Sequence, residues 1–251
     1  RILSSAASDV YKRQWSMWLV IGLGASFALF QRFVILPMMD GPARSIWLLP
    51  LSLVFFLPTI HRLVIPSRFS DLYTGGNWFR AGMLFLFTWL AASVAMINPP
   101  LGDIAAPEVP DGIGIADTED VASVEYNEGD LILSVADGSP DITIGFSVRD
   151  NWKLEDIHMN ATIQRYGDAE VVLAGWMLDS SSATLSNQRY MEIANWTGSA
   201  EPASKAEDMG FAFDLESLEP GIHTISISLV EEGDLWKNRW SGEYTLNVQV
   251  Q

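Results

Sequence analysis

The chain has 251 residues, of which 49% are hydrophobic, and a formal net charge of −16. Residues 1–97 carry 8 Lys and Arg against 3 Asp and Glu, whereas residues 98–251 carry 7 against 28, a net −21. Such asymmetry predicts two parts in two environments, and the anionic part excludes nucleic acid as a partner. The absence of cysteine excludes disulfides, thiolate zinc sites and cysteine nucleophiles.

The first 14 residues do not resemble a natural protein sequence. "SSAASDVYKRQ", Ser4 to Gln14, is what one reading frame of a transposon-based sequencing adapter would encode. We therefore treat residues 1–14 as an adapter artefact rather than a polar leader, and we exclude them from the fold prediction. Lys12 and Arg13 are not used to orient the chain.

Three apolar segments follow and predict a transmembrane region over residues 15–98, with helices at about 15–36, 45–65 and 78–97. A helix needs roughly 20 residues to cross a bilayer. The third segment meets this length without a charge beyond Arg80, and the first meets it if Arg32 snorkels to the interface. The alternative, buried helices of a soluble domain, leaves too little polar surface to keep such a domain in solution.

The second segment is the weakest of the three. It contains Pro50 and Pro58, and His61 and Arg62 interrupt it before its end. It therefore either spans with a kink or is re-entrant or interfacial. The predicted fold class is accordingly an N-terminal transmembrane hairpin or three-helix bundle, followed by an all-β immunoglobulin-like sandwich.

Orientation follows from the basic residues that flank the third segment. Arg62, Arg68 and Arg80 precede its apolar core, and no Lys or Arg follows it until Arg149. The positive-inside rule places the arginine side in the cytoplasm and the acidic part outside, whether two or three segments span. The chain leaves the membrane through a Pro-rich acidic linker over residues 99–120. Proline ends the preceding helix there, because it cannot continue one.

From about Val121 the hydrophobic period changes to two, which predicts a β-sandwich domain over residues 121–251. The expected strands are short runs rich in Val, Ile, Thr and aromatic residues, separated by Gly, Pro and Asp turn signals. They are "VASVEY", "LILSVA", "ITIGFSV", "IHMNATIQ", "VVLAGWML", "YMEIANW", "FAFDL", "HTISISLV" and "YTLNVQV".

Two stretches carry a family resemblance. "LEPGIHTISISLVEEGDLWKNRWSGEYTLNVQV", Leu218 to Val250, resembles the last two strands of immunoglobulin-like domains of bacterial and archaeal cell surfaces. "ITIGFSVRDNWKLEDIHMNATI", Ile142 to Ile163, resembles their early hairpin, with Asp150 near the turn. The resemblance implies a sandwich fold and a surface location but no reaction, because sandwiches host many functions.

No catalytic residue emerges from the sequence, and we expect no enzyme and no cofactor. Neither G-x-S-x-G nor H-E-x-x-H occurs. We expect His61 at a membrane edge, and His158 and His223 on strand surfaces.

Acidic clusters raise the question of calcium, which takes six to eight oxygen ligands. They lie at Asp117-Glu119-Asp120, Asp150-Glu155-Asp156 and Glu231-Glu232-Asp234. None has the EF-hand spacing, and a solvated acidic surface is the simpler interpretation. The sequence therefore assigns no metal site.

One stretch is a candidate binding site, the expected loop "DLWKNRWSG" from Asp234 to Gly242. Trp236 and Trp240 flank Lys237 and Arg239 there. Aromatic and Arg side chains at a loop tip are common anchors of binding surfaces. The equal alternative is that one or both tryptophans fold back as a lid on the sandwich core.

These observations predict a multi-pass protein of the cell membrane. Its partners are the lipid bilayer and a protein or glycan outside the cell. We expect a role in binding, adhesion or assembly of an envelope complex. The alternative is an accessory subunit of a membrane transporter or membrane enzyme, whose signature would be ionisable residues within the membrane, with Arg32 as its candidate.

Overall fold

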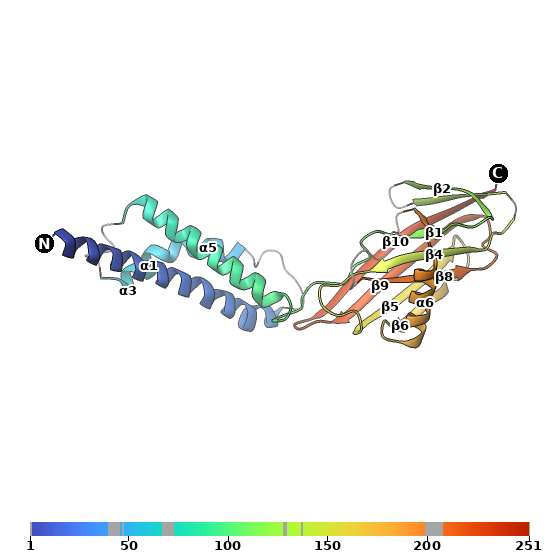
Figure 1. Cartoon of the computed structure of the whole chain (residues 1–251). Coiled ribbons are helices and arrows are strands. Elements are labelled where there is room, and N and C mark those ends of the chain that lie inside the picture. Colours follow the sequence, from blue (N-terminus) through green and yellow to red (C-terminus); the bar gives the residue numbers. More distant parts are fainter. Residues whose placement is uncertain are drawn as a thin grey trace. The chain divides into compact units, whose positions relative to one another are not determined.

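The computed structural model describes residues 2–39, 46, 48–66, 73–127, 130–136, 138–198 and 208–250, with side chains described from residue 14 onward except at 127. The chain divides into a helical unit, Arg1–Asp103, and a β-rich unit, Ile104–Gln251 (Figure 1). Arg68, used above for orientation, lies outside the described residues, and so do the side chains of Lys12 and Arg13.

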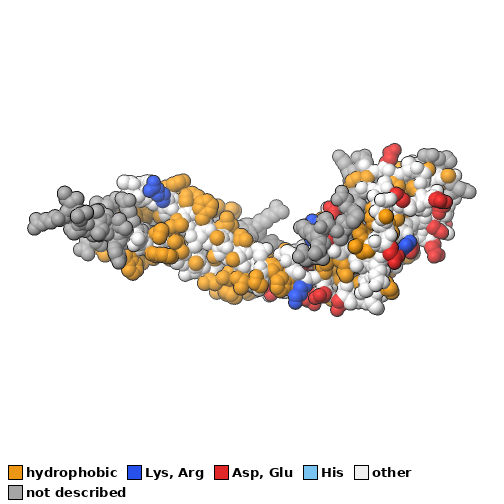
Figure 2. Space-filling view, in the orientation of Figure 1, with side chains coloured by type: hydrophobic (Ala, Val, Ile, Leu, Met, Phe, Trp, Pro, Cys, Tyr) orange, Lys and Arg blue, Asp and Glu red, His pale blue; other side chains and the backbone are white. Residues whose placement is uncertain are grey.

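The helical unit contains two long apolar helices. Helix α1 (Ile2–Phe30) continues as a π-helical turn, η1 (Gln31–Ile35), and a 3₁₀ turn, η2 (Leu36–Met38); helix α5 spans Gly75–Ile97. The stretches Gln14–Met38 and Gly75–Ile97 are each long and apolar enough to cross a membrane. Figure 2 shows hydrophobic side chains over much of this unit and acidic ones on the β-rich unit.

Helices α1 and α5 run in the same direction. Gly24 of α1 approaches Phe85, and further along both helices the indole Nε1 of Trp89 donates to Gln31 Oε1 at 2.8 Å. Still further, Arg32 Nε donates to the Met96 carbonyl oxygen at 3.1 Å. Residue numbers therefore rise together along the contact. Two helices of a hairpin would be antiparallel, so this geometry does not fit the two-helix alternative.

The chain returns between the two long helices through a broken helical segment, Leu49–Val64. It consists of α2 (Leu49–Leu53), the 3₁₀ turn η4 (Val54–Phe56) and α3 (Leu57–Val64), and a proline occupies the first turn of both α2 and α3. Proline lacks the N–H that would bond the carbonyl four residues earlier. Pro58 therefore accounts for the interruption at η4.

The β-rich unit consists of two sheets. A four-stranded sheet has the order β7-β1-β4-β8, and a six-stranded sheet has the order β2-β3-β10-β9-β5-β6. All pairings are antiparallel except β3 with β10, which is parallel. The strands are β1 (Gly114–Ala116), β2 (Val121–Asn127), β3 (Asp130–Val135), β4 (Ile142–Val148), β5 (Ile157–Arg165), β6 (Val171–Met177), β7 (Trp196–Gly198), β8 (Met209–Leu215), β9 (Gly221–Glu232) and β10 (Lys237–Val250).

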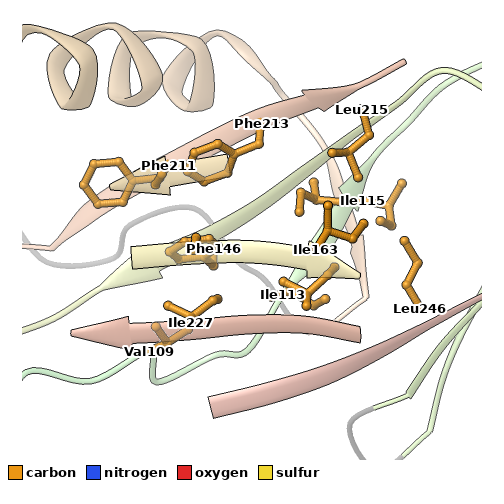
Figure 3. Close-up of a cluster of buried hydrophobic side chains, with 14 of the residues drawn as sticks. Val109, Ile113, Ile115, Phe146, Ile163, Phe211, Phe213, Leu215, Ile227 and Leu246 are labelled. Carbon is orange, nitrogen blue, oxygen red and sulfur yellow. The ribbon is translucent and has the colours of Figure 1, made fainter. Parts of the chain in front are cut away.

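Both sheets contribute to one hydrophobic core. Alternate residues of β5 and β9 point into it, including Met159 and Ile227, and from the other sheet Phe146 stacks on Phe213 with ring centroids 5.7 Å apart (Figure 3). The two-residue period places one face of each strand in the core and the other outside. The predicted sandwich therefore corresponds to two sheets around a shared core.

Three local expectations differ from the structure. Tyr190-Met191-Glu192, expected in a strand, ends helix α6 (Ser181–Glu192), whose N-cap Ser180 accepts from the Ala183 N–H at 3.2 Å. The stretch expected as a linker contributes strand β1 and the buried side chains of Ile113 and Ile115. The expected early hairpin is wrong, because β4 and β5 belong to different sheets.

Helix α6 covers part of the open edge of β8. The Ser186 hydroxyl donates to the Ala212 carbonyl at 2.8 Å and accepts from the Ala212 N–H at 3.0 Å, and the Asn187 amide donates to the Gly210 carbonyl at 2.9 Å. These main-chain groups point away from β4, so they would otherwise remain unpaired at a sheet edge. Polar side chains of α6 thus replace a neighbouring strand.

Candidate functional site

The candidate site lies at one end of the long hairpin formed by β9 and β10. The sequence predicted a loop from Asp234 to Gly242, but the structure confines the turn to residues 233–236. Lys237, Arg239 and Trp240 are strand residues, paired with Glu232, Val230 and Leu229 of β9. The ladder therefore continues almost to the end of the hairpin, and the expected nine-residue loop is wrong.

Trp240 faces the core rather than solvent. Its side chain is partly buried, packs against the hydrophobic core and lies over Gly242, where a Cβ would come 2.5 Å from the Trp240 Cη2 atom. Glycine at 242 therefore leaves the room that the indole occupies. For Trp240 the geometry matches the lid alternative, whereas Trp236 lies in the turn and is partly exposed.

The opposite side of the hairpin carries the cations. Lys237 Nζ lies 2.5 Å from Glu232 Oε1 in an exposed ion pair, and Arg239 is exposed. Strand alternation places Lys237 and Arg239 on the outer face, away from Trp240. The four predicted site residues are thus not brought together: two cations face outward, one tryptophan faces the core and the other lies in the turn.

A buried polar pair supports the same hairpin. Glu231 is 2% exposed, and Asn238 Nδ2, directly across the ladder, donates to Glu231 Oε2 at 3.0 Å. One oxygen of Asp150 also lies within 4.8 Å of a Glu231 oxygen, so two of the predicted acidic clusters meet here.

The histidines have structural partners. His223 is buried, contrary to the expectation of a surface position, and its Nε2 donates to the Glu219 carbonyl at 2.8 Å. His158 is exposed on β5, as expected. His61 is fully buried in the helical unit: its Nδ1 lies 3.0 Å from the Leu57 carbonyl, and its Nε2 lies 3.0 Å from the Ser16 hydroxyl. A carbonyl only accepts, so Nδ1 carries the proton and Nε2 accepts from Ser16.

Sequence reasoning missed the polar side chains buried between the helices, apart from Arg32. Gln31 and Ser93 are 2% and 4% exposed, and Gln31 accepts the Trp89 indole hydrogen bond. Arg32 donates to the carbonyl of Met96, in the last turn of α5. A positive charge is stabilising there, because the C-terminal end of a helix carries the negative end of its dipole. Isolated polar residues inside apolar runs were the available signal. Arg32 therefore has a structural role, because it caps the C-terminal end of helix α5.

At the other end of the sandwich, an open groove of about 670 Å³ lies between strands β6 and β8. Its lining is mostly apolar and acidic. The lining includes Ile163, Val171, Val172, Leu173, Phe213, Leu215 and Leu218, together with Asp168, Asp214, Glu216 and Glu219.

The cation of this groove is already engaged. Arg165 forms an ion pair with Glu219, lies 3.6 Å from Asp168 and donates to the Pro220 carbonyl at 2.9 Å. Arg189 in turn lies 3.5 Å from Asp214. Four carboxylates against these two cations leave the groove with a net negative charge. Sequence patterns did not identify it, because its two walls come from strands that begin 38 residues apart in the chain (residues 171 and 209).

Comparison with known proteins adds little to this geometry. No family model matches the chain, and no curated protein matches it. Among solved structures, the chain is similar to AggA, the major subunit of aggregative adherence fimbriae type I from Escherichia coli. The identity is 9%, the match covers 48% of this chain and 89% of that chain, and the TM-score is 0.26.

Proposed function

We propose that the protein is anchored in the cell membrane by its helical unit and presents the β-sandwich outside the cell for binding, adhesion or assembly of an envelope complex. The observation that carries the proposal is the charge distribution around α5. Arginines precede its apolar stretch, and 28 acidic residues but only 7 basic ones follow it. The positive-inside rule orients such a helix with its C-terminal side out.

The dimensions of the helical unit support a membrane location. Helix α5 has 23 residues, or about 35 Å, against about 30 Å for the hydrocarbon core. Because α1 and α5 run in the same direction, the chain has to return between them, which favours three crossings. The broken segment Leu49–Val64 supplies the return.

We further propose that the sandwich is of the immunoglobulin type. Strands β4 and β8 pair in one sheet, as strands B and E of that fold do, and β5, β9 and β10 are neighbours in the other, as strands C, F and G are. β6 extends the second sheet beside β5, in the position of strand C′ of variable-type domains. Helix α6 occupies the stretch of chain in which those domains have strand D.

The alternative role is an accessory subunit of a membrane transporter or enzyme. The observation that favours it is the set of polar side chains buried between the helices, above all Gln31, Arg32 and His61. Their contacts with Trp89, Met96 and Ser16 give each of them a role in helix packing. We therefore prefer the surface role.

Cysteine labelling in intact cells tests the topology. The 251-residue chain has no cysteine, so a thiol introduced into it is a single target for a membrane-impermeant maleimide. Glu119 is exposed in a turn of the sandwich, and Thr74 is exposed just before α5. We expect Glu119→Cys to label in intact cells and Thr74→Cys only after lysis. Protection of Glu119→Cys until lysis would refute the orientation.

A further inference from the structure

We propose that the groove between β6 and β8 binds an extended, cationic and apolar peptide segment, whose main chain pairs with the edge of β6. The inference deepens the proposed function by naming a partner class for the exposed domain. The inference rests on the proposed function in one respect: a peptide must be able to reach the sandwich.

The first argument is the state of the two strand edges. Helix α6 satisfies the N–H and carbonyl of Ala212 and the carbonyl of Gly210 on β8. Strand alternation points the main chain of Asp214 the same way, into the lining of the groove. Strand β6 is the last strand of its sheet and lines the opposite wall. The groove thus lies where an added strand finds main-chain donors and acceptors.

The second argument is the apolar floor. Phe213 and Leu215 are nearly buried, at 7% and 8% exposed, and close the bottom of the groove, whereas Val171 and Val172 on β6 are 57% and 66% exposed. Because successive side chains of a strand point to opposite faces, these two valines do not form a single row, but each adds apolar contact area to the lining of the groove. A floor of this kind selects apolar residues at every second position.

The third argument is charge, which selects the occupant. Asp168, Asp214, Glu216 and Glu219 line the groove. Arg165 is bonded to Glu219 and Pro220, and Arg189 lies 3.5 Å from Asp214, so four carboxylates stand against two cations. A second copy of this domain would bring its own excess of carboxylates against this groove, since residues 98–251 carry 28 acidic against 7 basic residues. Electrostatic complementarity therefore favours a segment in which Lys or Arg alternates with apolar residues.

The test uses the full chain in lipid nanodiscs and a fluorescent peptide of alternating lysine and valine, with binding followed by anisotropy. Two control peptides separate the contributions: one replaces lysine with glutamate, and one carries N-methyl groups on alternate amides so that one edge cannot pair. We expect the lysine peptide to bind, the methylated one to bind at least about tenfold more weakly because of lost hydrogen bonds, and the glutamate one not to bind.

Protein variants locate the site. Val172→Lys places a cation on the exposed edge of the groove, and Val250→Lys makes the same change at the similarly exposed end of β10. The contribution of charge is tested with the double variant Asp168→Asn and Glu216→Gln in the groove. Its control is the double variant Glu119→Gln and Asp120→Asn, which removes the same charge elsewhere on the domain. We expect the groove variants to weaken lysine-peptide binding by about threefold to tenfold and their controls to leave it unchanged, because exposed charges each contribute at most about 1 kcal/mol.

Three outcomes would overturn the proposal: equal binding of the lysine and glutamate peptides, equal effects of the groove variants and their controls, or tight binding of the methylated peptide. Dimerisation that Val172→Lys abolishes, without peptide binding, would assign the groove to a second copy instead. The measurement does not depend on membrane orientation. Failure here with Glu119→Cys labelled in intact cells would remove the peptide site and leave the surface location standing.

Discussion

Replacing Gly24 by alanine tests the closest approach between α1 and α5. A Cβ at this position would lie 2.9 Å from the Phe85 carbonyl oxygen and 3.1 Å from both Thr88 Cβ and Trp89 N. Two of these neighbours are backbone atoms, which cannot rotate away. The helices would therefore have to separate by a few tenths of an ångström.

Gly22 provides a matched control on the same helix. No atom lies within 4 Å of a Cβ placed there. Alanine favours a helix over glycine by about 1 kcal/mol, and this gain is common to both substitutions. Overpacking costs about 1–3 kcal/mol, and only Gly24→Ala incurs it. The difference in unfolding free energy between the two variants should therefore be about 1–3 kcal/mol, with Gly24→Ala the less stable.

The assay is unfolding of the purified protein in detergent micelles, followed by the loss of helical circular dichroism on titration with a denaturing detergent. The wild type and Gly22→Ala set the reference. Equal midpoints for Gly22→Ala and Gly24→Ala would refute the close crossing and, with it, the parallel packing of α1 on α5.

Further changes test the β-rich unit. Ser186→Ala should lower its stability by about 2–4 kcal/mol and speed hydrogen exchange at Ala212, because two main-chain groups lose their partner, whereas Ser182→Ala on the exposed side of α6 should change neither. Trp240→Ala should destabilise the sandwich by about 2 kcal/mol, roughly half the cost for a fully buried tryptophan, as seen in chemical denaturation. Burial, and then the charge of a neighbouring tyrosine, raise the pKa of Tyr244. The resulting stabilisation is fully present below the unfolded-state pKa of about 10 and is lost as pH rises through the folded-state pKa. Tyr244→Phe should flatten this alkaline loss in unfolding curves, and an unchanged slope would contradict it.

Features that depend on local pattern could be predicted from the amino-acid sequence. Seven of the nine expected strand runs coincide with β2 to β6, β8 and β9, and "YTLNVQV" forms the second half of β10. Period-two hydrophobicity is visible in a single segment, because each strand buries one face whatever its neighbours are. The apolar lengths of α1 and α5 and the break at Pro58 follow from composition in the same way.

Which elements contact one another could not be read from local patterns and emerged only from the folded chain. The assignment of β4 and β5 to different sheets, the shared direction of α1 and α5, and the covering of β8 by α6 all depend on contacts between distant residues. Trp240 shows the consequence at one residue. Its neighbours in the chain are polar and predict a loop, but pairing with Leu229 continues the strand and turns the indole over Gly242 toward the core. Local sequence sets the period of a strand, whereas its register and partners set which face is buried.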